Sequence, residues 1–245
     1  ETEYMTIQRI ESLIYRADDV GEGVRYFEDW GLETVEKGPS GAIFRTPENQ
    51  IVHVREADDP GLPPSPQGGS TMVQTTWGVD GKASLEAIGA ELEKDRAVAT
   101  DADSTIHATD ETGFAIAFCV ADRTPVTPEA PKVNLHTDVN RLNLPVDPEL
   151  RAAPIRIGHV VFHIPRQGAE DATSFYLDRL NFRLSDRARD TGDFMRCDGS
   201  QDHHTLFLAH RMNRALFNHA AFEVRDFNEI MLGGKHMKRR GWEAN

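Results

Sequence analysis

Basic residues are scarce in this sequence of 245 residues, with 27 Lys and Arg against 40 Asp and Glu and a formal net charge of −13. A surface of that sign repels nucleic acid and anionic membranes, so we expect neither as a partner. The acidic residues are spread along the chain and form no tail. The charge therefore indicates an ordinary solvated acidic surface.

Cysteine is almost absent, since the chain has only Cys119 and Cys197. The two fall in different repeat units, so we predict two reduced thiols and a cytoplasmic protein rather than a disulfide. Long apolar runs are also missing, because no stretch approaches the roughly 18 residues that a membrane span needs. The first residues show no basic stretch followed by an apolar run, so we expect no secretory signal.

A short apolar strand with an aromatic residue three positions later occurs four times. Its copies begin at Ser12, Gln74, His159 and His219. The starts lie about 60 residues apart within the first and the second pair, and about 85 residues separate the pairs. Helical spacing of apolar residues follows each copy. It predicts helices over residues 19–30, 83–94, 170–180 and 227–240, and strand-like runs at 33–36, 42–45, 51–54, 183–185, 193–196 and 205–208.

Each repeat therefore has the order β-α-β-β-β, and one unit of this size is too small to bury a good core alone. We predict an α+β fold of four such modules paired into two domains. The first domain covers residues 1–123, a proline-rich linker covers 124–154, and the second domain covers 155–245. The fourth module is incomplete in this sequence, which stops after its helix.

The first residues of the four repeated strands, called strand heads below, differ in their ability to bind a metal. Ser12 and Gln74 are poor ligands for a divalent metal, whereas His159 and His219 are good ones. A histidine and an aromatic residue three positions later point to opposite faces of a strand. A pseudo-twofold between the paired modules would then bring both imidazoles into one cleft, so we predict that His159 and His219 bind a metal.

A second histidine signal lies between these two residues, where His203 and His204 open the last strand of the third module. A neutral imidazole there could take and return protons near neutral pH. A mononuclear iron site that activates oxygen also needs a carboxylate beside its two histidines. The repeat places that third ligand beyond Asn245, and Glu223, on the same face as His219, is a weaker alternative.

Four segments resemble the carboxy-terminal domain of type I extradiol ring-cleavage dioxygenases. These enzymes belong to the vicinal oxygen chelate superfamily, together with glyoxalase I and the bleomycin-resistance proteins. The segments are residues 156–162, 175–180, 202–206 and 218–222. The resemblance implies an Fe(II) or Mn(II) enzyme that cleaves a catechol-type aromatic diol with O2, and an amino-terminal domain without a metal. It assigns His159 and His219 as ligands and His204 as the acid/base, with His203 as the alternative.

Two other functions within the superfamily stay open at this point. One is a glyoxalase-type isomerase, which normally takes ligands from other strands, including carboxylates. The other is a small-molecule-binding protein like the bleomycin-resistance proteins, which typically have a single two-module domain without metal histidines. The sequence names no particular catechol, and it leaves a homo-oligomer open.

Overall fold

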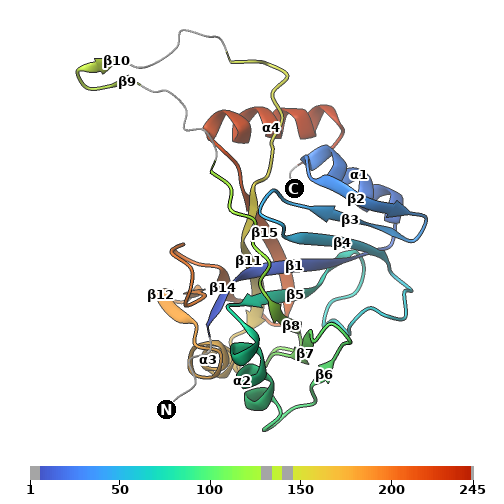
Figure 1. Cartoon of the computed structure of the whole chain (residues 1–245), viewed down its shortest axis with the longest axis vertical. Helices are drawn as coiled ribbons and strands as arrows, with labels where there is room; N and C mark the ends of the chain where they lie inside the picture. Colours follow the sequence, from blue (N-terminus) through green and yellow to red (C-terminus); the bar gives the residue numbers. More distant parts are fainter. Residues whose placement is uncertain (1–5, 128–133, 140–145, 244–245) are drawn as a thin grey trace.

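The computed structural model describes residues 6–127, 134–139 and 146–243, and its strands form two main sheets (Figure 1). The first sheet has eight strands in the order β2-β3-β4-β1-β5-β8-β7-β6, and the second has five in the order β12-β13-β14-β11-β15. A separate two-stranded hairpin, β9 (Asn134–Leu135) and β10 (Asp138–Val139), lies in the predicted linker.

The first sheet contains two complete copies of the predicted module. The first copy is β1 (Ile7–Ala17), α1 (Val20–Trp30), β2 (Glu33–Gly38), β3 (Gly41–Arg45) and β4 (Ile51–Glu56). The second is β5 (Thr71–Val79), α2 (Lys82–Leu92), β6 (Ala99–Thr100), β7 (Ile106–Thr109) and β8 (Ala115–Val120). The leading strands β1 and β5 pair antiparallel at the centre, and each pairs in parallel with the last strand of its own module.

The second sheet repeats this plan with one and a half modules. The third module is β11 (Arg156–Pro165), α3 (Ala169–Ser174), η1 (Phe175–Arg179), β12 (Arg183–Ala188), β13 (Gly192–Arg196) and β14 (Leu206–Met212). The fourth has β15 (Leu216–Glu223) and α4 (Phe227–Arg239). Strand β11 pairs antiparallel with β15 and parallel with β14, as β1 does with β5 and β4. The predicted α+β fold of four modules, with the fourth incomplete, is confirmed.

Local sequence explains where the helices begin and end. The side chains of Asp19 and Asp226 cap α1 and α4 by accepting hydrogen bonds from backbone N–H groups in the first turn. Gly31 ends α1 in the left-handed conformation, with φ of 99°. Helices α1 and α4 lie side by side at the top of Figure 1. None of the helices among the described residues is long and apolar enough to cross a membrane.

The helix predicted over residues 170–180 differs in its second half. It is α-helical only over Ala169–Ser174 and continues as the π-helix η1. Two consecutive aromatic residues of η1, Phe175 and Tyr176, lie in the core with exposures of 2% and 1%.

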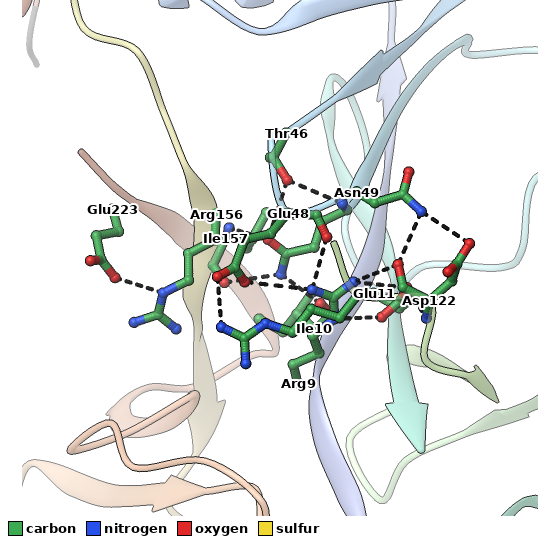
Figure 2. A network of polar contacts seen from close by, with 12 residues as sticks. Arg9, Ile10, Glu11, Thr46, Glu48, Asn49, Asp122, Arg156, Ile157 and Glu223 are labelled. Carbon is green, nitrogen blue, oxygen red and sulfur yellow. Dashed lines mark hydrogen bonds and ion pairs between the residues drawn. The ribbon is translucent and has the colours of Figure 1, made fainter. Parts of the chain in front are cut away.

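The two sheets share one hydrophobic core, and polar side chains join their backbones. Gln50, with 1% exposure, donates to Ile10 O at 2.6 Å and to Ile157 O at 3.2 Å, and it accepts from Ile157 N at 2.7 Å. Tyr176 of η1 donates to Asp110 Oδ2 at 2.8 Å. Figure 2 shows the network around Ile10 and Ile157, where strands of both sheets meet. The domain boundaries stay a prediction.

A third contact between the two halves lies nearer the surface, where Arg179 of η1 reaches α2 and the turn after it. Its guanidinium binds Glu91 at 3.0 Å and Asp95 at 2.7 Å.

Both cysteines are free, as the sequence predicted.

Candidate functional site

The two histidines predicted as metal ligands lie in contact. Their Nε2 atoms are 3.2 Å apart, although 60 residues separate them in the chain. His159 is in β11 and His219 is in the neighbouring strand β15. The structure therefore brings together the pair that the sequence repeat singled out.

The pairing register explains this contact and agrees with the alignment of the four repeats. In the first sheet Ser12 faces Thr76, and Gln74 faces Ile14. In the second sheet His159 faces Ala221, and His219 faces Val161. The stagger between the two strand heads is the same in both sheets, so Ser12 and Gln74 occupy the positions that the two histidines hold in the second sheet.

A neighbouring side chain orients the ring of His219. Its Nδ1 lies 2.5 Å from Asn218 Oδ1, and Asn218 Nδ2 lies 2.7 Å from His163 Nε2. Because the amide oxygen can only accept, His219 carries its proton on Nδ1 and leaves the Nε2 lone pair free. His163 accepts from the amide, so its own proton is on Nδ1, which is buried without a partner.

The contacts of Asn218 and His163 with His219 were not predicted from the sequence. His163 is one of the histidines that received no functional assignment, and Asn218 adjoins His219 at a position where strand alternation would direct it to the other face. The one available signal was a residue with a polar amide directly before the predicted ligand.

The surroundings keep the histidine pair in the neutral form that binds metals. Burial, followed by repulsion from His204 and His219, lowers the pKa of His159 to about 4. Burial also lowers the pKa of His219, and repulsion from His163 lowers it further. Both imidazoles are therefore unprotonated at neutral pH, and metal binding needs no loss of a proton from either.

His204 lies directly against the pair. Its ring centroid is 4.2 Å from that of His159, with an angle of 32° between the planes. Burial, followed by the charges of His203 and His219, lowers the pKa of His204. His203 is exposed, its Nδ1 is 3.2 Å from His204 Nδ1, and its ring packs against Phe194. His203 and His204 line a cavity of 290 Å³ together with His159.

The histidine pair fits a divalent metal by its geometry. Two nitrogens bound to one ion at about 2.1 Å and at a right angle lie about 3.0 Å apart, close to the observed separation. Among the residues that the structure describes, no group of three or more His, Cys, Asp or Glu side chains could hold a metal. Glu223, the weaker alternative for the third ligand, binds Arg156 Nε at 2.6 Å.

Comparisons with known proteins find relatives of the segment that forms the second sheet. Residues 156–244 match the model of the Glyoxalase/Bleomycin resistance protein/Dioxygenase superfamily. Metapyrocatechase 2 of Cupriavidus necator is 37% identical over 92 residues, which make up 38% of this chain and 28% of that protein. The matched segment thus spans little more than a quarter of this relative.

Solved structures of similar shape cover almost the whole chain. The Mn(II)-bound glyoxalase of Novosphingobium aromaticivorans has a TM-score of 0.70 and 21% identity, over 96% of this chain and 72% of that one. The 2,2',3-trihydroxybiphenyl 1,2-dioxygenase of Sphingomonas wittichii strain RW1 has a TM-score of 0.69 and 21% identity, over 97% and 80%.

Residues 156–244 thus resemble the glyoxalase, bleomycin-resistance and dioxygenase superfamily, and the whole chain shares the fold of the two solved structures. The resemblance to extradiol dioxygenases that the sequence predicted is confirmed by the match to a metapyrocatechase.

Proposed function

We propose that this protein is an extradiol ring-cleavage dioxygenase that uses Fe(II), with Mn(II) as the alternative, to open a catechol-type aromatic diol with O2. The observation that carries the proposal is the contact between His159 and His219, whose Nε2 atoms are 3.2 Å apart in the segment that matches the superfamily model. The described residues hold no group of three or more His, Cys, Asp or Glu side chains for a metal, and Glu223 stays the weaker alternative for the third ligand, a carboxylate in our prediction.

His159 and His219 would hold the metal, which when bound supplies a Lewis acid that gathers the diol and O2 at one centre. Asn218 would orient His219 through its Nδ1 proton. His204 lies against His159, and its lowered pKa makes it a neutral base at pH 7. It would accept a proton from the diol hydroxyl and later return it to the opened product, with His203 as the alternative.

The remaining assignments are part of the same proposal. The division into two domains with a linker at residues 124–154, and a first domain without metal, is supported by the two sheets and by Ser12 and Gln74 at the strand heads. The two free cysteines support a cytoplasmic location. The acidic charge supports small-molecule substrates rather than nucleic acid or membranes as partners.

Oxygen uptake by the purified protein tests the function. The protein is loaded with Fe(II) without air and offered a panel of monocyclic and bicyclic catechols. We expect oxygen uptake with a yellow ring-opened product, abolished in His219→Ala and retained in His107→Ala, a histidine of the first sheet bound to Asp101.

Two other outcomes would contradict the proposal in different ways. Iron binding without oxygen uptake on any catechol would indicate another reaction of the superfamily, such as a glyoxalase-type isomerisation. Neither iron binding nor uptake would indicate a protein that binds small molecules without catalysis.

A further inference from the structure

One guanidinium on β11 joins three segments of the second sheet. Arg156 binds Asp202 with two parallel hydrogen bonds, Nη1 to Oδ2 at 2.6 Å and Nη2 to Oδ1 at 2.8 Å. Its third nitrogen, Nε, donates to Glu223 Oε2 at 2.6 Å (Figure 2). The planar fork of an arginine is the side chain that can bind one carboxylate with two bonds and still reach a second.

Each of the three joined segments carries one histidine of the candidate site. Arg156 stands three residues before His159 in β11, and Asp202 stands two residues before His204. Glu223 lies opposite Arg156 in the pairing of β11 with β15, on the strand of His219. The Arg156 contacts therefore fix β11, the loop before β14 and β15 against one another within a few residues of all three imidazoles.

The same contacts set the local charge. One guanidinium lies between two carboxylates, and the Arg156 charge holds the pKa of Asp202 below its usual range. Asp202 therefore stays ionised at neutral pH as the partner of this guanidinium. Arg156, Asp202 and Glu223 also border the cavity that His159 and His204 line.

We propose that Arg156 is a positioning residue that sets His159, His204 and His219 in their mutual geometry through Asp202 and Glu223. The proposal rests on the proposed function for its link to metal binding, although the positioning itself concerns the metal-free protein. Loss of the fork removes the side-chain link between these segments, so that only the backbone pairing of β11 with β14 and β15 sets the mutual position of the three imidazoles.

The first sheet holds a matched arrangement without histidines. Arg9 stands three residues before Ser12, as Arg156 does before His159, and it binds Glu11 at 2.7 Å and Glu48 at 3.5 Å. Gly78 takes the place of Glu223 opposite this arginine. Figure 2 shows Arg9 and Arg156 near each other, where the two sheets meet. Arg9 therefore provides a control for the loss of an arginine–carboxylate contact in the same structural position.

The first measurement is of the side-chain ¹H–¹⁵N resonances of histidine in the metal-free protein, for wild type, Arg156→Lys and Arg9→Lys. Lysine keeps the charge but loses the fork. We expect Arg156→Lys to shift the ring resonances of His159, His204 and His219, and Arg9→Lys to leave them in place. Asp202→Asn, which removes the same paired contact from the other side, is the second variant if Arg156→Lys does not fold. Unchanged ring resonances in a folded variant would overturn the proposal.

The second measurement is of Mn(II) affinity by equilibrium dialysis. We expect Arg156→Lys to weaken binding by about 10- to 100-fold, the usual effect of losing a partner that orients ligands, and Arg9→Lys to keep the wild-type affinity. Equal losses in both variants would mean a general structural role and would overturn the proposal. A wild-type protein that binds no Mn(II) would contradict the metal function, whereas the ring resonances would still decide the positioning role.

Discussion

Loss of the Asn218 amide should weaken metal binding at the candidate site. Asn218→Ala removes the acceptor of the His219 Nδ1 proton, so the ring can rotate and change tautomer. We expect Mn(II) affinity to fall about 10-fold or more, with little change in the stability of the metal-free protein, since the residue is exposed. Equilibrium dialysis beside Asn213→Ala, an exposed asparagine in the turn before β15, measures the effect. Equal affinities in the two variants would contradict this role.

His159 should make the metal-free protein sensitive to moderate acid. Its pKa is about 4 in the folded protein and about 6.5 in an unfolded chain, so the unfolded chain binds more protons between these values. Stability is therefore lost as the pH falls from about 6.5 to 4. We expect the urea midpoint to fall more steeply over this range for wild type than for His159→Asn. Parallel curves for the two proteins would rule the effect out.

The sequence could predict those residues of the site that residue type and position alone single out. His159 and His219 share a repeat register, and His204 opens a strand, so identity and spacing were enough to choose residues that the structure brings together, while their roles stay a prediction. Asn218 acts by folding back onto its neighbour, and Arg156 acts through carboxylates that lie 46 and 67 residues further along. Contacts of that kind depend on strand pairing and side-chain rotamers, which spacing along one sequence does not determine.

The end of α1 depends on the left-handed backbone conformation of Gly31. Gly31 has φ of 99°, and a Cβ there would lie 2.4 Å from Ala152 O. Gly113 also has a positive φ, of 86°, but a Cβ there would meet nothing within 4 Å. We expect Gly113→Ala to lower the free energy of unfolding by about 1 kcal/mol and Gly31→Ala by about 1–3 kcal/mol more, because of the overlap. Urea unfolding of both variants gives the difference, and equal losses would contradict the close approach.

Most elements could be predicted because their signals are local. The apolar spacing after Asp19 and the glycine at 31 delimit α1, and the short alternating runs delimit β3 and β4. The π-helix η1 could not be predicted, because its apolar residues also fit an α-helix. The wider turn is favoured by tertiary contacts, namely the core around Phe175 and the hydrogen bond from Tyr176 to Asp110.

At the scale of the molecule, Gln50 should be a main determinant of how the two sheets hold together. Gln50→Leu leaves Ile10 O and both backbone polar groups of Ile157 without these partners in a buried setting. We expect the free energy of unfolding to fall by about 2–4 kcal/mol. Gln8→Leu, an exposed glutamine of β1, should change it by less than about 0.5 kcal/mol. Urea unfolding followed by tryptophan fluorescence compares the two, and similar losses would contradict the prediction.

The contacts that join the two halves differ in their access to water, which makes ionic strength a selective probe of them. Arg179 meets Asp95 at the surface, where about 1 M salt shortens the range of charge interactions to about 3 Å. The bonds of Gln50 and the pair of Tyr176 and Asp110 are buried and hold no exposed charge for salt ions to screen. High salt should therefore weaken the contact of η1 with α2 and leave the buried contacts of Gln50 intact. We expect amide hydrogens near Arg179 to exchange faster in high salt, and those of Ile157 to exchange at an unchanged rate.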